Sequence, residues 1–202
     1  MSSTQEAVVI PQEAVRHLFT EARTHHAWLP KKVEESTLRA LYDIMKWGPT
    51  SANTNPVRIV FVKSEEAKER LFPCLMPGNV DQTKAAPVTA IVAWDERFYE
   101  HIPRLFPHAP QMKDMFASNK EMSDSSAIQN SSLQGGYFIL AARAVGLDCG
   151  PMGGFDKAKV DEAFFKGTTW KSNFLCNLGY GDATKLHPRG PRLSFEEACK
   201  II

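Results

Sequence analysis

The helical segment at residues 123–145 is the sequence feature that most constrains the fold of this chain. It is the longest stretch with a helical pattern, and Gly146 closes it. The segment is rich in small side chains, which let another backbone approach closely. That approach can occur in a core or at a contact between two subunits. The small residues are Ser131, Ser132, Gly135, Gly136, Ala141 and Ala142.

Shorter helices are expected on both sides of this segment. Apolar residues recur at helical spacing from Pro11 to Thr24. A second helix opens at Ser36 or Thr37 and stops at Trp47-Gly48-Pro49. Further helices begin at Ser64, follow Asp156 to about Phe165, and open at a capping box of Ser194 and Glu197.

Three apolar, β-branched runs alternate with these helices and are expected to be strands: 57–62, 88–94 and 172–179. The stretch 95–121 contains three prolines, so it is interpreted as broken helices and loops. No internal repeat or linker divides the sequence. We therefore expect one α+β or α/β domain over residues 1–202, with a flexible N-terminal segment at 1–11.

Composition excludes several classes of protein. The net charge of +1, from 24 basic and 23 acidic residues, offers no basic field for nucleic acid. No apolar run approaches the roughly 20 residues of a membrane span, and no secretory signal precedes the domain, so a cytoplasmic protein is expected. The cysteines form no CxxC pair, which argues against a metal site or a disulfide framework. They are Cys74, Cys149, Cys176 and Cys199.

Two basic segments could bind phosphate. Arg23-Thr24-His25-His26 combines a guanidinium with a neighbouring hydroxyl, and residues 185–192 carry Arg189 and Arg192 in a segment stiffened by prolines. Taken alone, the first segment is better explained as a solvated helix end, and the second as a solvated tail.

Two further segments are suited to holding a flat ring. The loop 48–56 places hydroxyls and carboxamides between prolines, and these groups match the mixed edge of a flavin or pyrimidine. In 146–155, glycines at 150, 153 and 154 allow close approach of a ligand to the backbone. The alternatives are an ordinary polar turn and a tight connection between two helices. Neither GxGxxG nor GxxxxGK[ST] is present.

The order and content of these four segments resemble the nitroreductase family. Its members carry an early Arg-Arg-Ser type box, a Pro-Ser-Ser-x-Asn loop, a Gly-Leu-Gly/Asp turn ending in Gly-Phe/Tyr, and a late basic pair. The counterparts here are Arg23-Thr24, residues 49–56, residues 146–155, and Arg189 with Arg192. The resemblance runs from about residue 13 to residue 198. It implies a mostly antiparallel sheet flanked by helices in an intertwined homodimer that binds FMN.

The resemblance also implies roles for individual residues. Arg23, Arg189 and Arg192 would hold the FMN phosphate, and Pro151 to Gly154 would lie against the isoalloxazine. The loop 49–55 would act on the flavin held mostly by the other subunit. The catalytic side chains are left unassigned, because the flavin carries the chemistry. The full set of cofactor-binding candidates is Arg23, Thr24, His25, Pro49, Thr50, Ser51, Asn53, Asn55, Pro151, Met152, Gly153, Gly154, Arg189 and Arg192.

Several runs resemble the malonic semialdehyde reductase subgroup more closely, among them FTEARTH, MKWGPTSAN and GLDCGPMGGFD. That likeness implies reduction of 3-oxopropanoate to 3-hydroxypropanoate with NADH or NADPH in pyrimidine degradation. His108, Lys113 and Arg104 could bind the substrate carboxylate. The chain departs from the wider family at His26 and at Val57, where an arginine and an aromatic residue are common. The alternatives are a general nitro or quinone reductase, a non-catalytic flavin-binding protein, and a hydrolase using Cys149.

Overall fold

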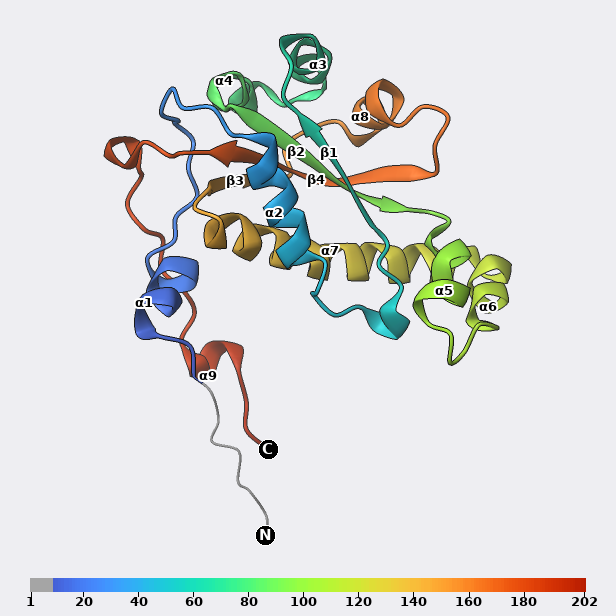
Figure 1. The fold of residues 1–202 in the computed structure, drawn as a ribbon. Coiled ribbons are helices and arrows are strands. Elements are labelled where there is room, and N and C mark those ends of the chain that lie inside the picture. The colour runs from blue at the N-terminus through green and yellow to red at the C-terminus, as the bar shows by residue number, and fades with distance from the viewer. Residues whose placement is uncertain (1–8) are drawn as a thin grey trace.

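A four-stranded antiparallel sheet forms the middle of the molecule in this computed structural model, which describes residues 9–202 (Figure 1). The strands are β1 (Val57–Val62), β2 (Val88–Asp95), β3 (Asp148–Met152) and β4 (Trp170–Gly179), in the order β1-β2-β4-β3. All eight residues of β2 are buried, as expected of an apolar strand covered on both faces. Ile91 of β2 pairs with Val60 on one side and Leu175 on the other. The expected antiparallel α+β class is confirmed.

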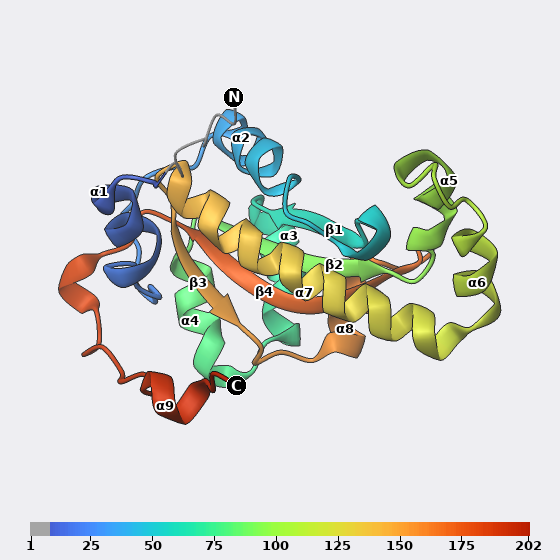
Figure 2. The ribbon, with the colours of Figure 1, turned by 90° about the horizontal axis from the view of Figure 1, so that it is seen from below.

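Helices cover both faces of the sheet (Figures 1 and 2). The first face carries α2 (Glu35–Met45) and α7 (Lys120–Ala144), and the second carries α3 (Glu65–Leu71), α4 (Pro77–Ala85) and α8 (Lys157–Phe164). Short helices α5 (Ile102–Leu105) and α6 (Met112–Ser118) lie at the N-terminal end of α7. At the opposite end lie α1 (Gln12–Val15), its π-helical continuation Arg16–Thr20, and α9 (Phe195–Ala198).

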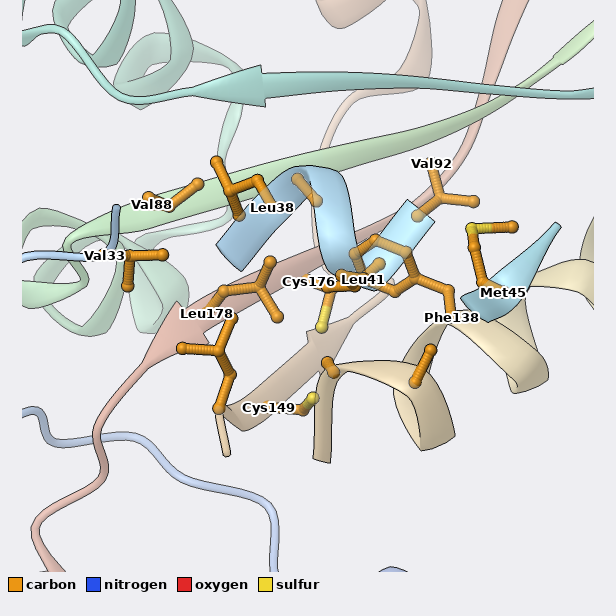
Figure 3. Close-up of a cluster of buried hydrophobic side chains, with 14 of the residues drawn as sticks. Val33, Leu38, Leu41, Met45, Val88, Val92, Phe138, Cys149, Cys176 and Leu178 are labelled. Carbon is orange, nitrogen blue, oxygen red and sulfur yellow. The ribbon is translucent and has the colours of Figure 1, made fainter. Parts of the chain in front are cut away.

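The main core lies between α2, α7 and the sheet (Figure 3). Leu41 and Met45 project from α2, and Phe138 projects from α7, onto residues of β2 and β4. Their side chains are fully buried, and burying one such side chain stabilises the fold by roughly 2 kcal/mol. A second core under α3 and α8 contains Leu71 and Val160.

Most of the expected elements are present, although three segments differ. Residues 11–24 are helical only to Thr20, because the chain then straightens and pairs with Cys149. The turn expected at 146–155 contains the edge strand β3. Helix α4 was not expected from its sequence. Part of the expected N-terminal segment, residues 1–8, lies outside the described residues.

The small residues of α7 have two different surroundings. A Cβ on Gly135 would lie 2.5 Å from Cε1 of Phe174, a residue of β4, so this glycine allows α7 to approach the sheet of its own chain. Gly136 has no atom within 4 Å of such a Cβ and lies on the outer face of α7. The close approach at Gly135 is therefore an internal contact.

Within residues 9–202, no helix combines the length and the apolar character needed to cross a bilayer. In the same range, no group of three or more His, Cys, Asp or Glu side chains is arranged to hold a metal ion.

Candidate functional site

A cavity of about 400 Å³ joins the two basic segments singled out in the sequence. Arg23 and Thr24 line it from the segment after the π-helix, and Arg189 and Arg192 line it from the segment after β4. The two segments contact each other although more than 160 positions separate them. Arg189 Nη2 donates to the carbonyl oxygen of Ala22 at 2.9 Å. Arg23 in turn donates to the carbonyl oxygen of His187.

The lining of this cavity is strongly cationic. Arg143, at the C-terminal end of α7, adds a fourth guanidinium, and His26 and His187 add two imidazoles. No carboxylate lies among the lining residues, and none within residues 9–202 lies within ion-pair distance of the four arginines. Arg143 Nη1 donates to the carbonyl oxygen of Leu18 at 2.7 Å. A guanidinium has five donors, so most remain free for an anion such as phosphate.

A trough leads from this cavity along the outer face of α7. A hollow beside Leu140, Gly136 and Leu133 shares Arg143 with the cavity. A second hollow shares Ser132, Gly136 and Ile139 with the first and reaches Pro151, Met152 and Gly153 of the β3 region. Arg143 and Gly136 are seven residues apart, about 10 Å along a helix. A cationic end and an apolar end are thus connected over the length of a small ligand.

The donor set and the glycines fit a phosphorylated planar ring. A Cβ on Gly153 would project into open space, so the backbone here forms a cradle that a flat molecule can approach closely. The opposite wall is apolar, with Ile139 and Phe174. Gly154 is held from behind, because Asn79 Nδ2 donates to its carbonyl oxygen at 2.8 Å.

The loop 48–56 contributes no side chain to this trough, although its first residue, Gly48, packs against Tyr137. None of its residues lines the cavity or either hollow. The loop is instead fixed to the other side of α7, where Asn130 accepts from the Ser51 amide at 2.7 Å and Gln134 accepts from the Val57 amide at 3.0 Å. Asn53 and Asn55 have positive φ values and line a separate cavity of about 640 Å³. One chain therefore does not bring this loop to the arginines.

His25 also lies outside the lining of the trough. Its side chain is buried, and Nε2 lies 3.5 Å from Oδ1 of Asp148. Pro49 is exposed, and Thr50 accepts a hydrogen bond from the Asn55 amide at 3.2 Å within the loop itself.

Four residues of the site were missed by sequence reasoning. Arg143 and His187 complete the cationic cavity. Asn79 and Gln82 of α4 form a chain of hydrogen bonds that runs from Gly154 to His26. Asn79 and Gln82 lie on α4, a helix that was not expected. Their part in the site could therefore have been predicted only if α4 itself had been predicted.

A nucleophilic role for Cys149 finds no support in this geometry. Its side chain is 1% exposed and lies in the main core. Its neighbour Cys176 is equally buried, and contact with the Cys149 thiol together with burial raises the pKa of Cys176 well above its usual value. Both thiols are therefore packing residues that substrate does not reach.

Comparisons with known proteins bear on the family to which this chain belongs. Residues 20–180 match the family model described as the nitroreductase family. A Ralstonia nicotianae protein whose name assigns it as an NADH dehydrogenase/NAD(P)H nitroreductase is 56% identical over 185 residues, which cover 92% of this chain and 94% of that protein.

Two solved structures show the same fold. The nitroreductase ydfN of Bacillus subtilis superposes with a TM-score of 0.83 at 20% identity, covering 95% of this chain and all of that one. A nitroreductase of Exiguobacterium sibiricum, solved in complex with FMN, superposes with a TM-score of 0.82 at 21% identity, covering 98% and 100%.

Proposed function

Because this chain belongs to the nitroreductase family, we propose that it is an FMN-dependent oxidoreductase that takes electrons from NADH or NADPH. The observation that carries the proposal is the trough along α7. Four arginines without carboxylate partners stand at one end of it, within the described residues, and a glycine cradle stands at the other. FMN combines a phosphate with a flat ring and would match both ends.

Individual residues have distinct tasks in this proposal. Arg23, Arg143, Arg189 and Arg192 hold the phosphate, and Thr24 adds a hydroxyl donor. Pro151, Met152 and Gly153 support one face of the ring. When bound, FMN supplies the hydride transfer, and the protein supplies binding and orientation. His25 is better explained by the contact with Asp148 than by a direct contact with the cofactor.

We further propose that the active form is a homodimer. Ile128, Leu133 and Tyr137 form an apolar outer face on α7, and each is 42–50% exposed. Residues 193–202 extend from the body and expose Leu193, Phe195, Ile201 and Ile202. Apolar surface of this extent favours association with another chain. A second copy could also bring the loop 49–55 to the trough, as the resemblance implies.

The finer proposal is that the acceptor is 3-oxopropanoate, a small aldehyde with a carboxylate. Its support is the likeness of the quoted runs to the malonic semialdehyde reductase subgroup. Val57, buried at the start of β1, offers no aromatic surface to a larger acceptor. The general nitro or quinone reductase remains the second candidate, and the name of the Ralstonia nicotianae relative favours it.

Of the three residues suggested for the carboxylate, the geometry favours Arg104. It lines the cavity that contains Asn53 and Asn55, and no carboxylate of residues 9–202 lies within ion-pair distance of it. Lys113 is engaged, because its Nζ lies 2.7 Å from Glu100. The hydrogen bond from Lys113, and to a smaller extent the one from Arg97, lowers the pKa of Glu100 to about 2. Glu100 and Lys113 therefore both stay charged at neutral pH. His108 packs edge-on against Phe106.

Spectroscopy of the purified protein tests both levels of the proposal. We expect the protein to bind FMN, to lose the flavin absorbance on addition of NADH or NADPH without oxygen, and to regain it with 3-oxopropanoate. Reoxidation by a nitroarene or a quinone but not by 3-oxopropanoate would favour the second candidate. FMN binding without bleaching by either nicotinamide would indicate a non-catalytic flavin-binding protein.

A further inference from the structure

The carboxylate of Asp148 contacts two segments that carry the arginines of the cavity. We define the first arm as residues 23–28 and the second arm as residues 181–192. We infer that Asp148 is the junction that holds the two arms in position, and that His25 is a positioning residue acting through it. The inference rests on the proposed function for the identity of the ligand.

The first arm lies tightly on β3. The amide of His25 donates to the carbonyl oxygen of Cys149 at 3.0 Å, and Thr24 forms an isolated parallel β-bridge with Cys149. A Cβ on Gly150 would lie 2.5 Å from the carbonyl oxygen of His25, so only glycine permits this approach. Arg23 precedes His25 by two residues, and its position therefore depends on this contact.

The second arm begins against the first. The amide of Asp182 donates to the carbonyl oxygen of Ala27 at 2.9 Å. The Gly181 amide donates to Oδ2 of Asp148 at 2.8 Å, while Oδ1 of the same carboxylate faces His25 Nε2 at 3.5 Å. One carboxylate thus contacts both arms. Beyond it, residues 187–192 form the opposite wall of the cavity.

The surroundings of His25 argue against a direct contact with the cofactor. Its Nδ1 is buried and has no hydrogen-bond partner within the described part of the chain. The ring lies on Gly181, where an added Cβ would come within 2 Å of Nδ1. Nε2 faces the carboxylate of Asp148. The side chain therefore stands between the arms and contributes no donor to the trough.

Substitutions that distinguish the two ring nitrogens test this inference. We expect His25→Ala and Asp148→Ala each to raise the FMN dissociation constant about tenfold, as loss of a charge-assisted contact does. The terminal amide of His25→Gln reaches the position of Nε2, so this variant should bind FMN within about threefold of wild type. The amide of His25→Asn reaches only the position of Nδ1, so this variant should behave like His25→Ala. Quenching of FMN fluorescence measures each constant.

Amide hydrogen exchange of the unliganded protein reports on the arms themselves. His25→Ala and Asp148→Ala should speed exchange at residues 24–29 and 181–192, whereas Glu162→Gln on α8 should leave both segments unchanged. The double variant should bind FMN no more weakly than the weaker single variant, because both changes break one junction. Circular dichroism checks that each variant folds. If Asp148→Ala does not fold, Asp148→Asn takes its place, because it keeps an oxygen for the Gly181 amide.

Three outcomes would overturn the inference. The first is retained FMN affinity in His25→Asn with loss in His25→Gln, which would place Nδ1 on the cofactor. The second is additive loss in the double variant. The third is unchanged exchange in both arms. If wild-type protein binds no FMN, the proposed function fails, and the exchange of the arms still decides the role of the junction.

Discussion

Arg143 lines both the cationic cavity and the adjoining hollow along α7, so it is the arginine that connects the two. We expect Arg143→Gln to weaken FMN binding about tenfold and to leave riboflavin binding unchanged, because riboflavin has the same ring without the phosphate. Fluorescence quenching titrations with both flavins measure the ratio. Arg39→Gln, at an exposed residue of α2, is the matched control. An equal loss for both flavins would show that Arg143 supports the fold and not the phosphate.

The arginines also show what the sequence can reveal about a site. Arg23, Arg189 and Arg192 stand in short segments with hydroxyls or prolines, so their pattern indicated a phosphate clamp, and the structure brings them to one cavity. Arg143 lies in the last turn of a long helix, where a basic residue is expected for its interaction with the helix dipole alone. The contribution of Arg143 to the cationic cavity depends on which segment packs against that turn.

At the scale of helices and strands, the sequence predicted the elements that have a strong apolar periodicity and missed the elements that lack it. Helix α2 has three buried residues on one face and was predicted almost to its ends. Helix α4 has the sequence PGNVDQTKA, in which only Thr83 is buried, so no apolar stripe marks it. Strand β3 reads DCGPM, and its glycine and proline indicated a turn. Pairing with β4 overrides that local preference.

The contact between α7 and β4 predicts opposite effects at two adjacent glycines. A methyl group at Gly135 meets the ring of Phe174, and overpacking of this kind costs about 1–3 kcal/mol. At Gly136 the added methyl meets no atom, and the higher helix propensity of alanine should stabilise the protein by about 0.5–1 kcal/mol. Urea unfolding of Gly135→Ala and Gly136→Ala measures both effects.

Phe174 also lines the hollow beside Gly153, so Gly135→Ala should weaken flavin binding by moving that ring. The loss would then arise within one chain, and not from a weakened subunit contact. Equal stabilities of the two alanine variants would show that Phe174 has room to move away.

The short helices α5 and α6 supply a test of the acceptor. We expect Arg104→Gln to raise the KM for 3-oxopropanoate about tenfold, because the substrate carboxylate loses a charge-assisted hydrogen bond. The KM for NADH or NADPH should not change. Lys113→Gln, whose cation is engaged by Glu100, should leave both constants near wild type. Steady-state kinetics with both substrates measures them, and a similar rise in the two variants would point to a general effect of charge.

At the scale of the whole molecule, the residues proposed for the flavin site lie on surfaces that one chain does not bring together. The arginines and Gly153 lie along the trough, and Asn53 lies on the other side of α7. Sequence alone gave no distances between these segments, so it could not show which of them one chain unites. In a symmetric dimer, the loop of each copy can reach the trough of the other. A homodimer would therefore contain two sites, each built from both chains.

Mixing two inactive variants tests that arrangement. We expect Arg192→Ala and Asn53→Ala each to lose most of their activity as pure proteins. When equal amounts are co-expressed, random pairing makes about half of the dimers mixed. Each mixed dimer has one trough with Arg192 facing an intact loop and one site with both changes. Activity should therefore return to about a quarter of wild type, because half of the dimers have one of two sites intact. If the loop served the trough of its own chain, every site would carry one change and no activity would return.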